Sequence, residues 1–315
     1  MTDKFSTLEL WRGLFWAVVT LFICISHAKG QNSEYLQKIP GTSASIDMIF
    51  IPSGDLQLII SGKSKKANLE GFWMSKYEIT YDQYQPFRDK EWDGNASEGN
   101  QNYDVDGISR PTTPYLDFTY GMGSTGGYPA VSMTQQAALR YCQWLYEKTG
   151  VFYRLATDLE WEYACLGGES SGKNPDKLAW HWENSDEKYH KVGTKAPNGY
   201  GLFDMRGNVS EYTADQHFEN GYNLAQLNFP HMVASPVRGR YGRSVRGGAY
   251  DDTPEDCSCK SNIPSNPAWQ ARDPQAPKSI WWNPDSPFVG FRIVRPAGEF
   301  SEEKVKAYFQ RVIKE

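Results

Sequence analysis

The sequence predicts a single α+β domain that is rich in loops, and three observations lead to this fold class. The chain of 315 residues is long enough to bury a sizeable core. Its 28 glycines and 18 prolines interrupt regular elements along the whole length. Helical periodicity is weak outside a few short stretches, which disfavours a helical bundle or a doubly wound parallel sheet.

The first 30 residues have the organisation of a signal peptide. Lys4 and Arg12 precede a mostly apolar run over 14–25, which is shorter than the roughly 20 residues that a transmembrane helix needs. Small residues in Ser26–Ala28 then offer a cleavage site. We therefore predict a signal peptide over 1–30 and an exported protein, periplasmic or secreted, with no membrane span in the mature chain. An uncleaved anchor is the alternative.

The remaining chain shows no break in composition, so we expect one main domain over 31–297 and an amphipathic helix over 298–315. Ser301 is a suitable cap for this last helix, which has one apolar face and would dock on the domain or on a partner. The net charge of −5 and the absence of a basic run give no electrostatic reason to expect nucleic acid.

Local patterns predict two strands and three further helices. The apolar run Met48–Pro52 and the alternating segment Gly71–Glu78 are typical of strands. Capping-box patterns, in which Ser or Thr is followed three residues later by Glu or Gln, start helices at Thr80, Ser132 and Thr157.

Four cysteines follow the first 30 residues, and this sparse number argues against a scaffold stapled by disulfides. Cys142 and Cys165 lie in apolar helical contexts, where buried hydrophobic cysteines are expected. Cys257 and Cys259 would share a face in an extended segment. That pair could be incidental, could form a disulfide, or could bind a soft metal.

The stretch Asn198–Tyr212 reads NGYGLFDMRGNVSEY, an irregular loop with glycines at its turns. Asn208 and Glu211 offer oxygen ligands of the kind that Ca²⁺ prefers. A structural turn with a hydrogen-bonded asparagine explains the same pattern.

Six motifs in order then resemble the formylglycine-generating enzyme family, also called the sulfatase-modifying factor domain. The resemblance covers about residues 45–296 and rests on YEITYDQY, YPAVSMTQQAALRYCQWL, YRLATDLEWEYACLGG, NGYGLFDMRGNVSEY, VRGGAYDD and VGFRIVRP. It implies a C-type-lectin-like fold with little regular secondary structure.

The resemblance also implies a structural calcium site at the GNxxE loop. Its ligands here would be the side chains of Asn208 and Glu211, with carbonyl oxygens near Arg206, Gly207 and Val209. A second calcium site of the family is not matched in this chain.

Enzymes of this family use O₂ and a copper ion held by two thiolates to convert a sulfatase cysteine to formylglycine. Counting from Arg246, Ala249 stands in place of the family's serine, Asp252 in place of its first cysteine, and Cys257 at its second cysteine. The resemblance therefore favours a domain without cysteine-oxidase activity that binds a protein or glycan ligand. The alternative is a working oxidase for sulfatases, with Cys257 and Cys259 as a rearranged copper pair.

A long loop over 261–288 carries the pair Trp281 and Trp282, which could bind a ligand as exposed aromatics or pack in the core. Arg272 and Arg292 stand where the resemblance implies buried arginines near the pocket. We expect Arg292 to pair with a carboxylate or a carbonyl oxygen in the core.

Overall fold

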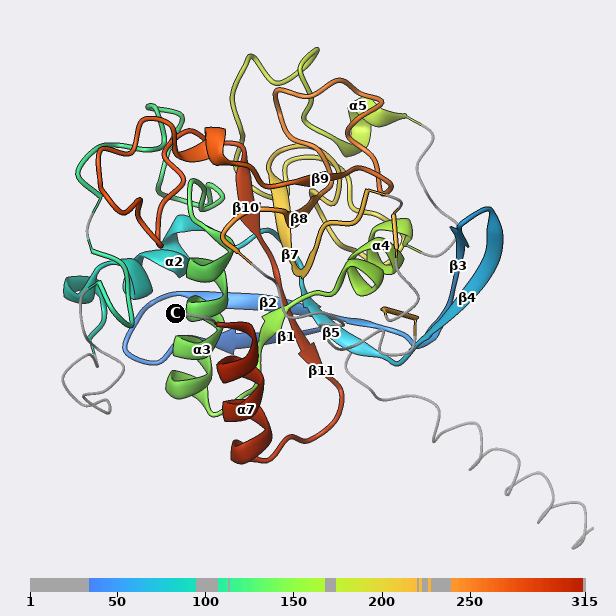
Figure 1. Cartoon of the computed structure of the whole chain (residues 1–315), viewed down its shortest axis with the longest axis horizontal. Coiled ribbons are helices and arrows are strands. Elements are labelled where there is room, and N and C mark those ends of the chain that lie inside the picture. Colours follow the sequence, from blue (N-terminus) through green and yellow to red (C-terminus); the bar gives the residue numbers. More distant parts are fainter. Residues whose placement is uncertain are drawn as a thin grey trace, which may run out of the picture. The chain divides into compact units, whose positions relative to one another are not determined.

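In the part of the chain that this computed structural model describes, two β-sheets and a β-hairpin form the framework, with helices packed around them (Figure 1). The structure describes residues 34–94, 107–112, 114–167, 174–219, 221–222, 226–227 and 239–313. The predicted signal peptide lies outside these residues. The strands are β1 Glu34–Lys38, β2 Ser45–Ile51, β3 Gly54–Ile60, β4 Lys63–Leu69, β5 Phe72–Ser75, β6 Arg154–Leu155, β7 Ser210–Gln216, β8 Arg243–Arg246, β9 Asn262–Pro264, β10 Val289–Phe291 and β11 Ile293–Pro296.

The larger sheet is antiparallel and has the strand order β1-β2-β5-β11-β6. Its strands are short but carry buried apolar side chains, and Met74 of β5 pairs with Ile49 on one side and Val294 on the other. Strand β11 comes from near the C-terminal end of the chain and lies between β5 and β6. The sheet therefore depends on pairings between segments far apart in the sequence.

The second sheet has the order β10-β7-β8-β9, with β10 parallel to β7. Strand β7 begins within the GNxxE motif, so that Glu211 is its second residue, and the strand is almost wholly buried. Strands β10 and β11 are separated by one residue, Arg292, and belong to different sheets. This arrangement brings Arg292 to the junction of the two sheets.

The hairpin β3–β4 has one buried face, as expected for alternating side chains on a two-stranded ribbon. Leu56, Leu58 and Ile60 point into a small apolar cluster with Leu159 and Tyr222. The sequence reading did not predict this hairpin.

The helices begin close to the expected positions. They are α2 Tyr81–Arg88, α3 Gln135–Thr149, α4 Asp158–Leu166, α5 Pro175–Leu178 and α7 Glu302–Val312, with short 3₁₀ turns at Lys90–Trp92 and Pro267–Gln270. Thr80 and Thr157 form the predicted capping boxes. The expected cap at Ser132 is wrong, because Thr134 accepts the N–H of Ala137 and Ser132 adopts a positive φ of 62° instead.

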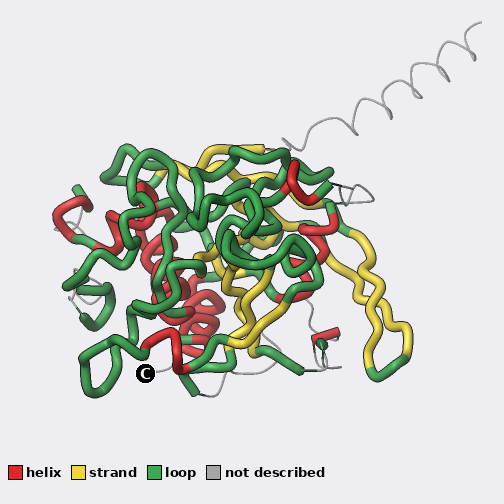
Figure 2. Tube along the Cα trace, turned by 90° about the horizontal axis from the view of Figure 1, so that it is seen from above, coloured by secondary structure: helices red, strands yellow, loops and turns green. Residues whose placement is uncertain are grey.

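The last helix, α7, docks on the domain itself. Val305 and Phe309 are buried, and the Phe309 ring lies 6.5 Å from that of Tyr146 on α3 (Figure 1). Long irregular connections join most elements, so the structure confirms the predicted loop-rich α+β class (Figure 2).

Within the described residues, no helix has both the length and the apolar character needed to cross a membrane.

Candidate functional site

The GNxxE loop turns sharply beneath a neighbouring segment. Gly207 has a φ of 66°, and a Cβ there would lie 2.0 Å from the carbonyl oxygen of Trp180, so only glycine fits. Asn208 follows with a φ of 57°. Its side-chain oxygen accepts the backbone N–H of His190 at 2.8 Å, and its amide donates to Glu78 Oε2 at 2.7 Å. The Asn208 side chain therefore ties the loop to two other segments.

Glu211 forms a buried ion pair with Arg292, as expected for that arginine. The guanidinium donates to both carboxylate oxygens over 2.6–2.9 Å, and Trp161 Nε1 donates to Oε2 at 2.7 Å. Arg292 also donates to the carbonyl oxygens of Ser75 and Phe203. This set of contacts joins the two sheets in the core.

These residues do not present an open donor set for Ca²⁺ in this arrangement. Calcium takes six to eight oxygen ligands, whereas the side-chain oxygens of Asn208 and Glu211 already accept hydrogen bonds from the protein. An ion bound to Glu211 would also lie beside the Arg292 guanidinium, which would repel it. Among the described residues, no three His, Cys, Asp or Glu side chains are grouped to hold a metal. We assign the loop a structural role and derive no chemistry through calcium.

Two further carboxyl groups, missed in the sequence reading, lie near Arg292. Burial raises the pKa of Asp204 to about 6, and burial together with Asp204 and Glu211 raises that of Glu78 well above its usual value. One oxygen of Asp204 has no hydrogen-bond partner within the described part of the chain. Arg292 carries one positive charge and therefore compensates only part of the negative charge of Glu78, Asp204 and Glu211.

The cysteines are arranged differently from the sequence expectation. Cys259 forms a disulfide with Cys165, which lies 94 residues earlier in the sequence. The Cα atoms of the two cysteines are 5.6 Å apart. Cys165 is therefore not a free hydrophobic cysteine, whereas Cys142 is free and buried as expected. Cys257 keeps a free thiol, which donates to the carbonyl oxygen of Ala249 at 3.3 Å. The proposed copper pair of Cys257 and Cys259 is not formed, because the Cys259 sulfur is already bonded.

The environment of Cys257 disfavours a thiolate. Burial raises the pKa of its thiol strongly, and the nearby carboxylates of Asp252, Asp256 and Asp251 raise it further. Asp252, which stands at the family's first cysteine, accepts the N–H of Ala249 at 2.9 Å and so closes a turn. A buried neutral thiol beside carboxylates lacks the soft paired ligands that Cu(I) requires.

Arg246, which precedes the two glycines Gly247 and Gly248, also has a structural role. Arg246 is buried and donates to Asp158 and Glu162 at 3.1 Å and to the hydroxyl of Tyr222 at 2.6 Å. Its contact with the carbonyl oxygen of Cys259, at 3.4 Å, links this network to the disulfide. The segment that holds the oxidase chemistry in the family is thus anchored here by ion pairs and a disulfide.

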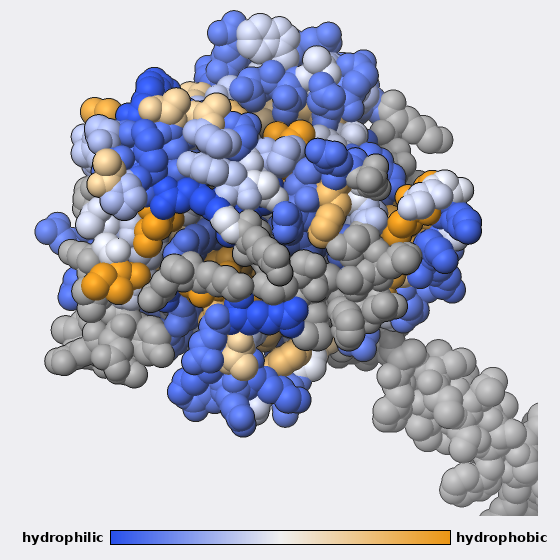
Figure 3. Space-filling model, in the orientation of Figure 1, coloured by the Kyte–Doolittle hydropathy of each residue, from blue (hydrophilic) through white to orange (hydrophobic). Residues whose placement is uncertain are grey.

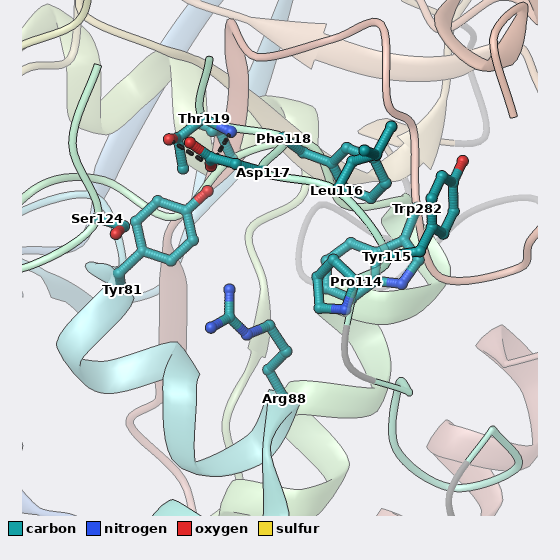
Figure 4. A pocket seen from close by; sticks show the side chains of 11 residues that line it. Tyr81, Arg88, Pro114, Tyr115, Leu116, Asp117, Phe118, Thr119, Ser124 and Trp282 are labelled. Carbon is teal, nitrogen blue, oxygen red and sulfur yellow. Dashed lines mark hydrogen bonds between the residues drawn. The ribbon is translucent and has the colours of Figure 1, made fainter. Parts of the chain in front are cut away.

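A pocket of about 380 Å³ lies elsewhere, among three segments that are distant in the sequence (Figure 4). Its lining comes from Tyr81 and Arg88 of α2, from the loop over 114–124, and from Val131 and Trp282. A pocket of this size is within the range for small-molecule sites in proteins. Of these residues, the sequence reading singled out only Trp282.

The pocket has a buried aromatic floor and an exposed apolar rim. Phe118 and Trp282 are buried, with ring centroids 5.8 Å apart, whereas Tyr115 and Leu116 are 45% and 64% exposed. Trp281 is buried as well, so both tryptophans of the predicted binding loop pack in the core. Arg272, expected to be buried, is exposed and pairs with Asp285, because its loop lies on the surface.

Two opposite charges face the pocket. The Arg88 guanidinium extends from the end of α2 into the space between Tyr81 and the aromatic side (Figure 4). Asp117 lies across from it and accepts hydrogen bonds from Thr119 and Gly121. Burial opposes ionisation of Asp117, but these hydrogen bonds and the charge of Arg88 outweigh it, so its pKa is lowered. Asp117 is therefore ionised at neutral pH.

Two nitrogen atoms of the lining residues are buried without a partner. Trp282 is 4% exposed, and its indole N–H has no hydrogen-bond partner among the described residues. The same holds for Nε of Arg88.

Comparison with known proteins identifies relatives of this chain. The sequence profile named Sulfatase-modifying factor enzyme 1-like domain matches residues 36–297. Formylglycine-generating enzyme of Mus musculus is 22% identical over 245 residues, which cover 60% of this chain and 63% of that protein. Chaperone protein LppX of Paenibacillus barcinonensis is 26% identical over 212 residues, covering 56% of this chain and 74% of that protein. The match to Serine/threonine-protein kinase pkn1 of Chlamydia pneumoniae, at 30% identity, covers 44% of this chain and only 22% of the kinase.

Solved structures share the fold. PvdO from Pseudomonas aeruginosa superposes with a TM-score of 0.60 at 20% identity. The match covers 85% of this chain and 100% of PvdO. Treponema denticola variable protein 1 gives a TM-score of 0.58 at 19% identity, covering 84% of this chain and 99% of that protein. At these identities the likeness concerns the fold alone, and it confirms the predicted C-type-lectin-like architecture.

Proposed function

Because this chain belongs to the sulfatase-modifying factor enzyme 1-like family, we propose that it is an exported member that does not oxidise cysteine and instead binds a protein or glycan ligand. The relatives differ in name, from a formylglycine-generating enzyme to a chaperone protein, so family membership by itself selects no activity.

The disulfide between Cys165 and Cys259 is the observation that supports the loss of oxidase activity most directly. Copper chemistry of the family type needs two thiolates at one ion, and the family resemblance offered only Cys257 and Cys259 for them. The sulfur of Cys257 is buried and protonated beside three aspartates. The sulfur of Cys259 is bonded to Cys165. Reduction of the disulfide would still leave Asp252, a hard oxygen ligand, where the family has a cysteine.

The pocket beside α2 supports a binding function. It has a defined volume, aromatic walls and two charged side chains, which is the combination expected of a site for a specific ligand. Among the coloured residues of the face shown in Figure 3, apolar side chains occur in small separate patches among polar ones.

The oxidase alternative is tested with a peptide that contains the sulfatase segment CxPxR. The copper-loaded, aerobic protein should form no formylglycine in this peptide above the level of a C257S control. Mass spectrometry is the measurement, and aldehyde product that depends on Cys257 would refute the proposal and establish an oxidase.

Export rests on the sequence of residues 1–30. Intact-mass measurement of protein from the native host should give a chain that begins near Lys29 or Gln31. A chain that retains residues 1–28 would contradict export by a cleaved signal peptide.

A further inference from the structure

We propose that the pocket beside α2 binds a free amino acid with an apolar side chain, held as a zwitterion between Arg88 and Asp117. This inference goes beyond the proposed protein or glycan ligand, because it assigns a small molecule to the pocket. It is drawn from two opposite charges that face one space without pairing, and from the apolar walls beside them.

Arg88 and Asp117 face the same pocket but do not contact each other. The guanidinium points from the end of α2 into the pocket, and the Asp117 carboxylate lies across from it (Figure 4). The charge of Arg88 favours the ionised form of Asp117, yet the two side chains form no ion pair within the described part of the chain. The space between them is therefore bounded by a positive group on one side and a negative group on the other.

Each of these two groups can still form hydrogen bonds with a ligand. Nη2 of Arg88 donates to Gln85 Oε1, whereas Nη1 has no partner among the described residues and, unlike Nε, keeps accessible surface. Asp117 is exposed; its Oδ1 accepts the N–H and the hydroxyl of Thr119, and its Oδ2 accepts only the N–H of Gly121, at 3.3 Å. A carboxylate oxygen can accept about two hydrogen bonds, so Oδ2 can accept one more.

A zwitterion matches this pair better than a ligand that carries one sign of charge. An anion would be attracted by Arg88 and repelled by Asp117, and a cation would meet the reverse balance. A neutral apolar ligand would remove water from both charged groups without replacing their hydrogen bonds, which costs free energy. The carboxylate of an amino acid can instead accept from the guanidinium, while its ammonium group donates to the Asp117 carboxylate.

The walls of the pocket favour an apolar side chain on this amino acid. Phe118 and Trp282 form a buried aromatic surface, and the exposed side chains of Tyr115 and Leu116 stand at the rim. A side chain of the size of leucine or phenylalanine would remove part of this rim from water, which is favourable. A charged side chain would find no further opposite charge, because the described lining has no charged residue beyond the opposed pair.

The test measures the binding of four probes to the wild-type protein by calorimetry at pH 7. The probes are L-phenylalanine, L-phenylalaninamide, which lacks the carboxylate, N-acetyl-L-phenylalanine, which lacks the ammonium group, and glycine, which lacks the side chain. We expect L-phenylalanine to bind at least about 10-fold more tightly than each of the other three, as for the loss of one charged hydrogen bond or of one buried apolar group.

Two variants assign each charge of the ligand to its partner. R88Q should weaken L-phenylalanine by about 10-fold and leave the affinity for L-phenylalaninamide nearly unchanged, because the amide has no carboxylate to lose. D117N should weaken L-phenylalanine by a similar factor and leave the affinity for N-acetyl-L-phenylalanine at least as high. A general loss of folding would weaken all probes together, so this crossed pattern separates binding from stability.

Matched substitutions outside the pocket serve as controls. Arg295 lies over the ring of Tyr35, and Asp55 pairs with Lys66 on the β3–β4 hairpin. R295Q and D55N should both bind L-phenylalanine as wild type does. If D117N lowers the melting temperature, because Asp117 also holds its own loop, the four probes on the wild-type protein decide the outcome.

Four results would each overturn this inference. They are equal affinity for L-phenylalanine and either of its derivatives, equal affinity for glycine, no binding of L-phenylalanine at millimolar concentration, and wild-type affinity in both R88Q and D117N. Those outcomes leave the proposed loss of oxidase activity intact, because formylglycine formation is measured separately.

Discussion

Replacing Arg292 by methionine should destabilise the protein strongly. The Arg292 side chain is fully buried and donates to the Glu211 carboxylate and to the carbonyl oxygens of Ser75 and Phe203. Methionine would fill much of the same volume but supply no charge and no donor. Glu211 would then remain in the core with Trp161 Nε1 as its remaining side-chain donor.

The expected loss follows from the burial of the pair. Removing one partner of a buried ion pair costs about 3–5 kcal/mol, because the other charge is left without compensation. For a domain of this size each kcal/mol shifts the melting temperature by about 2–4 °C, so R292M should melt roughly 6–20 °C below wild type. Glu78 and Asp204 add to the cost, since the charge of Arg292 favours the ionised form of both carboxyl groups.

The assay is urea denaturation at pH 7 followed by far-UV circular dichroism. R295M serves as control, because Arg295 lies over the ring of Tyr35 and outside the buried network, and it should lose less than about 1 kcal/mol. The double variant E211Q/R292M should be more stable than R292M, since no unpaired Glu211 charge remains. A loss under about 1 kcal/mol in R292M, or a double variant that is no more stable, would refute the reasoning.

Two further predictions concern the same core network. EDTA should leave the melting temperature unchanged, because Arg292 already pairs with Glu211; a decrease that N208A abolishes would instead establish calcium at the GNxxE loop. The pKa of Asp204 is raised from 3.8 to about 6, so its contribution to stability is present below pH 4 and is lost as the pH rises through about 6. D204N should therefore gain up to about 3 kcal/mol in free energy of unfolding relative to wild type between pH 4 and pH 7, and equal pH profiles in chemical denaturation would contradict this.

The sequence was sufficient for features that depend on neighbouring residues. Capping boxes at Thr80 and Thr157 gave helix starts that the structure reproduces, because a cap is formed by side chains three residues apart. The ordered motifs predicted the fold through family resemblance. The short apolar run Met48–Pro52 predicted a strand, and the structure has a strand there, β2. One local prediction was wrong: Thr134 caps the helix in place of the expected Ser132, which adopts a positive φ.

The tertiary structure decided the features that join distant segments. Cys259 was expected to act with its neighbour Cys257, but folding places it against Cys165, and no local pattern encodes a partner 94 residues away. The oxygens of Asn208 and Glu211 have the chemistry of calcium ligands in the sequence, yet whether they face an ion or another side chain depends on the elements that meet them.

The pocket beside α2 shows the same limit for function. Its walls come from α2, from the loop over 114–124 and from Trp282, and none of these segments carries a recognisable binding motif by itself. The sequence determined which side chains are available, through local propensity and apolar patterning. The three-dimensional packing determined which donors are satisfied and which remain free, because hydrogen-bond partners and burial are properties of contacts between segments that are far apart along the chain.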